Sequence, residues 1–276
     1  MKIATIARSP IHSPNMASND AAILELVATE LRARDVETIT ICGEERIPHD
    51  IDAICHMSRT ATTLDWLRRA ESEGIIIINS PTAVENCSRL TMMQTLEKAG
   101  VPQPPFSILE MDASPASLSY PAWIKRAEGW SCHKDDICYA VNPQEAGKAL
   151  STMLMHGIEK AIHCVHLHGD ILKFYGIGRR FFHCCYPDPD KSKFGHEHIN
   201  GAPHRYPFSI ERMKELVFTA AGACNLEIYG GDCIIGKDGS ISIIDLNDFP
   251  SFSAVREKAA IEIAEYIIDK IKERKR

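Results

Sequence analysis

Two acidic side chains and one amide stand where a β-hairpin would bring them together. Two isoleucine-rich runs between positions 231 and 250 are separated by an Asp-Gly pair, which is a strong signal for a tight turn between antiparallel strands. If this pair forms the turn, Asp232 lies directly opposite Asp245. Asn247 then shares a face with Asp245, because side chains repeat every second residue along a strand.

Carboxylates that face each other across two strands repel, so this register requires a cation beside them. Side-chain oxygens suit Mg²⁺, which takes one or two carboxylates and keeps water or phosphate oxygens as its other ligands. The same register pairs Ile234 with Ile243. A slip of one residue would separate the carboxylates and leave them as solvated strand ends, which is the alternative interpretation.

Alternating strand and helix patterns precede this hairpin. Over the first eighty residues they predict a parallel sheet with helices. The predicted strands are Lys2–Ala7, Val36–Ile41, Asp52–His56 and Ile75–Ile78, and the predicted helices are Asp20–Arg34 and Thr62–Glu73. A further helix is predicted over Glu85–Ala99, followed by a proline-rich connector.

The pattern changes after the connector and predicts an antiparallel sheet with one helix on its face. The strand candidates are Ala122–Arg126, Asp136–Val141, Ala161–His168, Ile171–Gly176 and Arg180–Tyr186, and the helix is Pro143–His156. Pro187–Pro207 has four prolines and little periodicity, so we expect a mobile loop there, and His196-Glu197-His198 within it would suit a lid. Helices at Ser209–Cys224 and Ala254–Arg276 flank the hairpin.

Composition excludes several classes of protein. The chain has 276 residues, with 31 Lys and Arg against 37 Asp and Glu, so its net charge of −6 argues against a broad nucleic-acid footprint. No apolar run approaches a membrane span, and the ten cysteines include no C-x-x-C pair. We therefore expect a cytoplasmic protein that binds neither membranes nor nucleic acids, with its oligomeric state, monomer or homodimer, left open.

The stretch Asp245-Leu246-Asn247-Asp248-Phe249-Pro250-Ser251-Phe252 resembles the [D/E]-x-N-x-x-P-[S/G]-[F/Y] signature of ATP-grasp enzymes. Asp232 occupies the position of their first metal carboxylate. The likeness is to glutathione synthetase and to ligases that modify ribosomal proteins, with some likeness to inositol trisphosphate kinases of the same fold. The resemblance implies that Asp232, Asp245 and Asn247 hold Mg²⁺, with Mn²⁺ as an alternative, against the phosphates of ATP.

The resemblance also implies an ATP-grasp fold of mixed α/β and α+β class. An N-terminal parallel α/β domain, residues 1–80, is followed by two α+β lobes that enclose ATP. The linker helix and connector span 81–118, the central antiparallel lobe spans 119–178, and the C-terminal lobe with the metal-binding hairpin spans 179–276.

Several residues take nucleotide-contacting places in the same comparison. Lys125 ends a strand that resembles the "x-V-x-K" strand whose lysine contacts phosphates, and a lysine in an apolar strand needs a partner. Arg89 stands where many members carry a Lys or Arg, with an exposed helix residue as the alternative. Ser131 and His133 lie in the place of the flexible phosphate-covering loop, although this loop has a single glycine where most members have several.

Two further positions match the hinge between the ATP-grasp lobes, where backbone groups read adenine: Cys164 and Val165. The strand pair that follows places Lys173 and Arg180 towards the transferred phosphoryl group, in catalytic roles. Solvated strand ends are the alternative for both.

The first predicted strand is followed by Arg8, His12, Ser13 and Asn15. Ligands of open α/β sheets bind at the carboxyl ends of strands, so these residues are candidates for binding the acceptor, with a simple turn before the helix as the alternative. The activity implied by the resemblance is an ATP- and Mg²⁺-dependent carboxylate–amine ligase that forms an acylphosphate of a small molecule or peptide. A kinase acting on a small polyol or inositol phosphate is the second hypothesis, and a non-catalytic nucleotide-binding protein is the third.

Overall fold

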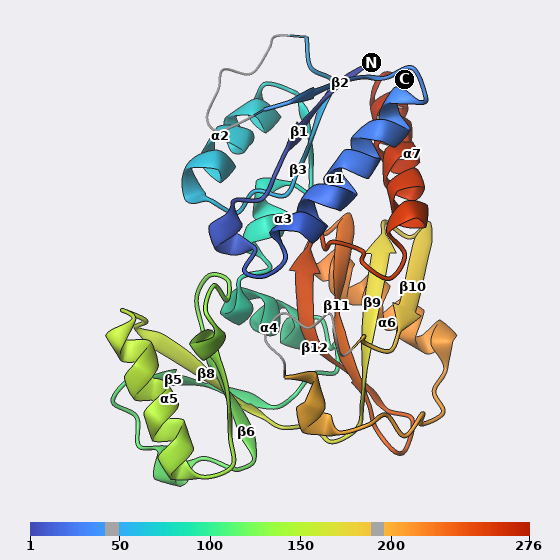
Figure 1. The fold of residues 1–276 in the computed structure, drawn as a ribbon. Coiled ribbons are helices and arrows are strands. Elements are labelled where there is room, and N and C mark those ends of the chain that lie inside the picture. The colour runs from blue at the N-terminus through green and yellow to red at the C-terminus, as the bar shows by residue number, and fades with distance from the viewer. Residues whose placement is uncertain (42–49, 189–195) are drawn as a thin grey trace.

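The structure, a computed structural model, describes residues 1–41, 50–188 and 196–276. Three four-stranded sheets follow one another along the chain (Figure 1). The first sheet is parallel and the other two are antiparallel, so the predicted mixed α/β class is confirmed. No helix in these three ranges is long and apolar enough to cross a membrane.

The N-terminal sheet is parallel, as the alternating pattern predicts, and its strand order is β2-β1-β3-β4. Its strands are β1 (Lys2–Ile6), β2 (Glu37–Thr40), β3 (Ala53–His56) and β4 (Ile76–Ile78). Helix α2 (Ala61–Ser72) covers one face, while α1 (Ala17–Arg32) and the C-terminal helix α7 (Arg256–Arg274) lie side by side on the other (Figure 1). The last helix of the chain therefore completes the core of the first sheet.

The single helix predicted over Glu85–Ala99 is wrong, because the structure divides it into α3 (Pro81–Glu85) and α4 (Arg89–Lys98). Ser88 lies between them with an extended backbone (φ −57°, ψ 132°). Its hydroxyl accepts a hydrogen bond from the amide of Gly129, 3.1 Å away, in a distant loop. This tertiary contact stabilises the break that local periodicity does not reveal.

The middle sheet has the order β5-β8-β6-β7 and is antiparallel, as predicted. The assignment of Ile171–Gly176 and Arg180–Tyr186 to this sheet is wrong, because both strands pair within the third sheet. Its strands are β5 (Phe106–Glu110), β6 (Ala122–Arg126), β7 (Ile137–Ala140) and β8 (Lys160–Val165), and α5 (Pro143–Met155) packs on one face. Strand β5 was not predicted. It is an edge strand in which only Leu109 is buried, so it lacks the alternation that marks a strand.

The third sheet has the order β10-β9-β11-β12 and carries the predicted hairpin. Its strands are β9 (Asp170–Ile177), β10 (Phe181–Cys185), β11 (Ile228–Ile235) and β12 (Ile241–Asp248), and α6 (Ile210–Ala223) packs on its apolar face. Short 3-10 helices lie at η1 (Pro10–His12), η2 (Pro115–Ser117), η3 (Lys134–Asp136) and η5 (Glu197–Asn200).

Asn79 joins the first sheet to the third. Its side-chain oxygen accepts hydrogen bonds from the amides of Glu227 and Ile228, at 2.8 and 2.9 Å, and its Nδ2 donates to the carbonyl of Ile228 at 2.7 Å. Asn79 is 1% exposed, so these hydrogen bonds have no competition from water. One side chain thus satisfies the backbone at the start of β11.

We expect Asn79→Leu to lower the free energy of unfolding by about 3 kcal/mol, because it leaves buried backbone groups at the start of β11 without partners. Urea denaturation measures the loss. Asn86→Leu is the matched control, since the Asn86 side chain makes one hydrogen bond with the described residues, 3.2 Å long, to the carbonyl of Cys224. We expect it to cost about 1 kcal/mol. Equal losses in the two variants would contradict this role for Asn79.

Candidate functional site

A cavity of about 340 Å³ lies where the three sheets meet. This volume is in the range of small-molecule sites. The N-terminal region contributes Arg8, His12, Ser13 and Arg59 to its lining, the middle sheet contributes Trp123, Lys125, Cys164 and Val165, and the third sheet contributes Lys173, Asp232, Asp245 and Asn247. Most of the predicted site residues are therefore brought together, although they come from distant parts of the sequence.

The hairpin that carries the two carboxylates contains a bulge. Asp232 lies opposite Asp245, as predicted, but the predicted pairing of Ile234 with Ile243 is wrong, because Ile234 pairs with Ser242. The turn closes with a hydrogen bond from the amide of Gly236 to the carbonyl of Ser240, at 2.9 Å, so it holds three residues instead of two. One extra residue in β12, Ile244, then restores the pairing of the carboxylates.

This bulge aims Asp245 at the cavity. Before it, Ile241 and Ile243 are buried in the core, and after it Leu246 is buried. Uninterrupted alternation would place Asp245 on the same face as Ile243, among apolar side chains. The extra residue changes the alternation, so Asp245 and Asn247 face the cavity instead.

Cations and an amide compensate the paired carboxylates. Lys173 Nζ lies 3.0 Å from Asp232 Oδ1, across the pair of strands β9 and β11. Asn247 Nδ2 donates to Asp245 Oδ2 at 2.7 Å, and Arg89 Nη1 lies 3.8 Å from Asp245 Oδ1. The side chain of Arg89 is 11% exposed, so the alternative of an exposed helix residue is wrong.

Two of the predicted nucleotide-binding residues flank this charge cluster. Ser131 Oγ accepts a hydrogen bond from Arg89 Nη2 at 3.2 Å. Lys125 lies on the middle sheet, with Nζ 5.9 Å from the centre of the Trp123 ring, and it forms no ion pair with any residue that the structure describes. Burial is the main cause that lowers the pKa of Lys125, and the nearby Arg89 charge acts in the same direction. An anion in the cavity would offset both effects.

The hinge residues Cys164 and Val165 line the cavity at the end of β8. Cys164 is buried against Met93, with its Sγ 3.9 Å from the Met93 sulfur. The amide of Val165 donates to the carbonyl of Pro105 at 2.9 Å, so this backbone donor is used within the fold.

The described part of the predicted mobile loop, after residue 195, is hydrogen-bonded to residues 167–170, which follow the hinge strand β8. Residues 189–195 lie outside the described residues. Asn200 Nδ2 donates to the carbonyls of Leu167 and Gly169, each at 3.0 Å. The buried carboxylate of Asp170 accepts hydrogen bonds from the amides of His204 and Tyr206, at 2.7 and 2.9 Å. Burial would raise the pKa of Asp170, but these backbone donors hold it below its usual value.

This segment adds two side chains to the cavity: His196, from the stretch that the sequence suggests as a lid, and Asn200, which the sequence did not assign there. The His196 ring stands edge-on to Trp123, with ring centres 5.4 Å apart. A wall of the cavity therefore comes from a stretch that has no strand or helix periodicity.

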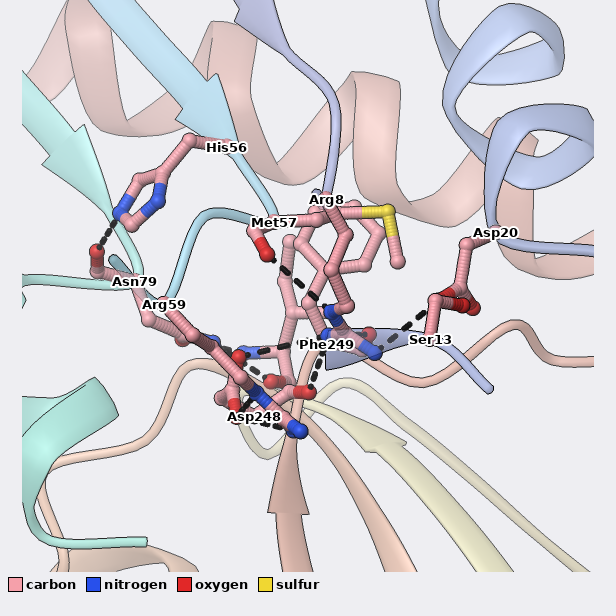
Figure 2. A network of polar contacts seen from close by, with 10 residues as sticks. Arg8, Ser13, Asp20, His56, Met57, Arg59, Asn79, Asp248 and Phe249 are labelled. Atoms are coloured by element: carbon pink, nitrogen blue, oxygen red, sulfur yellow. Dashed lines mark hydrogen bonds and ion pairs between the residues drawn. The ribbon is translucent and has the colours of Figure 1, made fainter. Parts of the chain in front are cut away.

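A buried ionic network closes the N-terminal end of the cavity (Figure 2). Asp248 Oδ1 accepts hydrogen bonds from Nε of Arg59, at 2.8 Å, and from its Nη2. Arg8 Nη2 lies 3.4 Å from Asp248 Oδ2, and Arg8 Nη1 lies 3.2 Å from Asp20 Oδ2. The hydroxyl of Ser13 also donates a hydrogen bond to Asp20 Oδ2, at 2.6 Å. Burial would raise the pKa of Asp248, but the two guanidinium charges outweigh it and hold the pKa below its usual value.

Three predicted site residues do not reach the cavity. Arg180 is exposed and forms ion pairs with Glu262, Glu265 and Asp269 of α7, so its predicted catalytic role is withdrawn. His133 is exposed, and its ring lies 5.8 Å from that of His156. Asn15 is an exposed turn residue with a φ of 61°, which fits the alternative of a simple turn before α1.

Comparisons with known proteins identify the fold. No family model and no curated protein matches the sequence. Solved structures do match, among them D-alanine–D-alanine ligase from Bacillus anthracis complexed with ATP, with a TM-score of 0.71, 14% identity and 99% of each chain covered. The chain has the ATP-grasp fold.

Two further structures agree. The RimK domain ATP-grasp protein from Sphaerobacter thermophilus has a TM-score of 0.68 at 15% identity, covering 97% of this chain and all of that one. VanG D-Ala:D-Ser ligase from Enterococcus faecalis has a TM-score of 0.72 at 13% identity, covering 98% of this chain and 99% of that one. At such identities the likeness concerns the fold.

Sequence reasoning missed three charged residues that line the cavity of this fold, Asp20, Arg59 and Asp248. Arg59 follows β3 as Arg8 follows β1, so the rule that selected Arg8 applies equally to Arg59. Asp248 lies inside the motif that identified Asn247, but its burial depends on contacts distant in sequence.

The buried imidazole of His56 makes the free energy of unfolding depend on pH. Its Nε2 donates to the carbonyl of Asn79 at 2.7 Å, while Nδ1 is enclosed without a hydrogen-bond partner among the described residues. Burial lowers the pKa of His56 to about 4. The unfolded chain therefore binds a proton at pH values where the folded protein does not, and stability falls as the pH drops from about 6.5 towards 4.

A fall in pH from 7 to 5 lowers the free energy of unfolding of the natural chain. We expect this loss to be about 2 kcal/mol smaller in His56→Gln. Urea denaturation at the two pH values gives the comparison. Exposed His198 provides the control, because His198→Gln removes a histidine without relieving a buried imidazole. The same pH dependence in the natural chain and in His56→Gln would refute the assignment to His56.

Proposed function

We propose that this chain is an ATP-dependent carboxylate–amine ligase that activates a carboxylate as an acylphosphate. The observation that carries the proposal is the placement of Asp232, Asp245 and Asn247 in one cavity with Lys125 and Arg89. Solved structures of the same fold include ligases for D-alanine with D-alanine and for D-alanine with D-serine, and one of them is complexed with ATP.

The donor set on the hairpin fits Mg²⁺. It consists of two carboxylates and an amide oxygen, and no group of three or more His, Cys, Asp or Glu suited to a metal occurs in the described ranges. Mg²⁺ needs few protein ligands when phosphates complete its shell, whereas zinc and calcium sites require more. Asp232, Asp245 and Asn247 would hold the ion, which would neutralise phosphate charge and orient the phosphates.

The cationic side chains would hold and polarise the phosphates. Lys125 is half-buried and has no carboxylate partner in the described structure, so a phosphate oxygen would supply its missing countercharge. Arg89 and Lys173 are held near the carboxylates at 3.8 and 3.0 Å, which keeps positive charge at the point where negative charge develops. Catalysis by these groups would consist of positioning and electrostatic stabilisation.

The reaction has two steps. An oxygen of the acceptor carboxylate attacks the γ-phosphorus in line, the bond to the ADP oxygen breaks, and an acylphosphate forms. An amine then attacks the acyl carbon, inorganic phosphate leaves, and the amine gives up a proton as the amide forms. The N-terminal end of the cavity balances Arg8 and Arg59 with Asp20 and Asp248, so it offers no surplus of positive charge for a polyphosphorylated acceptor. This balance favours the ligase over the inositol phosphate kinase.

The fate of the phosphate tests the proposal. The protein is incubated with ATP, Mg²⁺ and pools of amino acids, peptides and polyols, and ADP release is followed. Trapping of a hydroxamate by hydroxylamine, with free phosphate and an amide product, supports the ligase. Phosphate retained on a polyol would establish the kinase instead, and absence of ATP binding by calorimetry would exclude both enzymes.

Asp232→Asn and Asp245→Asn should each lower Mg²⁺-dependent ADP release by about a hundredfold or more, because each removes a negative charge that would hold the metal ion against the phosphates. Asp238→Asn is the matched control in the turn of the same hairpin, where the exposed carboxylate accepts a hydrogen bond from Ser240. It should retain near-normal turnover. Full activity in Asp245→Asn would refute the assignment of the site.

Lys125→Met should weaken ATP binding by about ten- to a hundredfold, because it removes one charge-assisted hydrogen bond in a half-buried setting. Isothermal titration calorimetry measures the affinity. Lys148→Met, on the exposed face of α5, serves as the control and should bind ATP like the natural chain. Equal affinities in the two variants would show that Lys125 does not contact the nucleotide.

A further inference from the structure

One guanidinium nitrogen at the N-terminal end of the cavity is left for a ligand. Arg59 uses Nε and Nη2 on Asp248. Its Nη1 makes no hydrogen bond with a residue that the structure describes, yet the atom is not fully enclosed. Because Arg59 lines the cavity while its side chain is only 4% exposed, the N–H donors of Nη1 open into the cavity.

Arg8 provides a contrast within the same network (Figure 2). Its Nε donates to the carbonyl of Met57 at 3.1 Å, and its Nη1 pairs with Asp20. Its Nη2 donates to the carbonyls of Asp248 and Phe249, at 3.1 and 2.9 Å. Every guanidinium nitrogen of Arg8 is therefore engaged by the protein, and this arginine serves the structure.

An aromatic cover lies over the open donor. The Trp130 ring centre is 5.3 Å from Cζ of Arg59, and the His12 ring stands edge-on to Trp130 at 5.8 Å. Trp130 Nε1 is enclosed and has no acceptor among the described residues, so the ring that covers Arg59 carries a second donor without a partner. A site covered by aromatic rings excludes water, which strengthens any ionic hydrogen bond made inside it.

Charge selects the ligand that this site would take. Arg8 and Arg59 are balanced by Asp20 and Asp248, so a ligand adds its own charge to a neutral group. A single negative charge is tolerated there more readily than the double charge of a phosphate monoester. A carboxylate accepts N–H donors with one charge spread over two oxygens, and it therefore matches the site.

We propose that Arg59 Nη1 binds a carboxylate of the acceptor substrate that does not react with ATP. The assignment rests on the proposed function for the identity of the acceptor. A carboxylate paired with a guanidinium is a weakened nucleophile. Arg89 and Lys173 lie beside Asp245 and Asp232, where the phosphates are proposed to bind, whereas Arg59 pairs with Asp248. The substrate class is thus a small molecule that carries a second carboxylate beside the one that is activated.

Binding of a simple carboxylate tests the site without turnover. The full chain is titrated with sodium acetate, acetamide or inorganic phosphate at constant ionic strength, and the indole N–H signal of Trp130, assigned with Trp130→Phe, is followed by NMR. We expect a saturable shift with acetate and none with acetamide. The indole of Trp123, beside Lys125, reports anions bound at the other end of the cavity.

Two arginine variants separate ligand binding from structure. Arg59→Lys keeps a charge for Asp248 but removes Nη1, and should weaken acetate binding at Trp130 about tenfold or more. Arg8→Lys makes the same change on the saturated arginine and should retain the acetate shift. Unchanged affinity in Arg59→Lys, or tighter binding of phosphate than of acetate, would overturn the proposal. If Arg59→Lys does not fold, absence of an acetate-specific shift in the natural chain overturns it equally.

Turnover provides the second readout. Acceptors with a second carboxylate should have a KM about tenfold or more below that of the analogues in which this second carboxylate is an amide, with similar kcat. Arg59→Lys should remove this difference in KM. If the KM difference is lost in Arg8→Lys and kept in Arg59→Lys, Arg8 and not Arg59 recognises the carboxylate, which refutes the proposal. If no acceptor supports ADP release, the proposed function fails, while the acetate titration still decides whether Arg59 binds a carboxylate.

Discussion

The carboxylate of Asp248 ends strand β12, one residue after Asn247, and it is 1% exposed. A charge buried at that depth is stable only when countercharges and hydrogen bonds are already in place. Arg59 and Arg8 supply both, and they follow the ends of β3 and β1. The N-terminal sheet must therefore dock against the end of the hairpin, and this docking supplies the third wall of the cavity.

A second contact holds the same end of the hairpin. Asn79 binds the backbone at the start of β11, where Tyr229 pairs with Asp248 of β12. The two strands are thus tied to the N-terminal sheet at one end and joined by the turn at the other. Asp232 and Asp245 face each other in the middle of these strands, between the tied end and the turn. The positions of the two carboxylates therefore depend on contacts at the end of the hairpin, made by residues that bind neither carboxylate.

Much of the fold follows from local patterns, because burial against a sheet imposes periodicity on each strand and helix separately. The parallel N-terminal sheet, the middle antiparallel sheet and the hairpin are all predicted on that basis. The facing of Asp232 and Asp245 is also predicted, although by a simpler register than the real one. A three-residue turn displaces the pairing by one residue, and the bulge at Ile244 displaces it back.

What the sequence does not reveal depends on contacts between distant residues. The break before α4 depends on Ser88 and Gly129, and the tethered segment after residue 195 depends on Asp170 and Asn200. Neither pair has a periodic signature, since each satisfies backbone groups at a single point. Arg180 shows the converse: its position in the chain matched a catalytic role, but the acids of α7 lie closer to it than the cavity does.

Arg8 and Arg59 carry the same signal in the sequence, a basic residue just after a parallel strand, and the structure distinguishes them by their remaining donors. Asp248 is shared by two guanidiniums, which together present more N–H groups than its two oxygens accept. Backbone carbonyls and Asp20 satisfy the surplus of Arg8, whereas Arg59 lies at the cavity wall, where nothing described satisfies its Nη1. Because Asp248 binds both guanidiniums, it docks the N-terminal sheet strongly and also leaves Arg59 Nη1 as a donor in excess. Stability of the sheet junction and recognition of an anion then depend on the same cluster, so a change to Asp248 would alter both together.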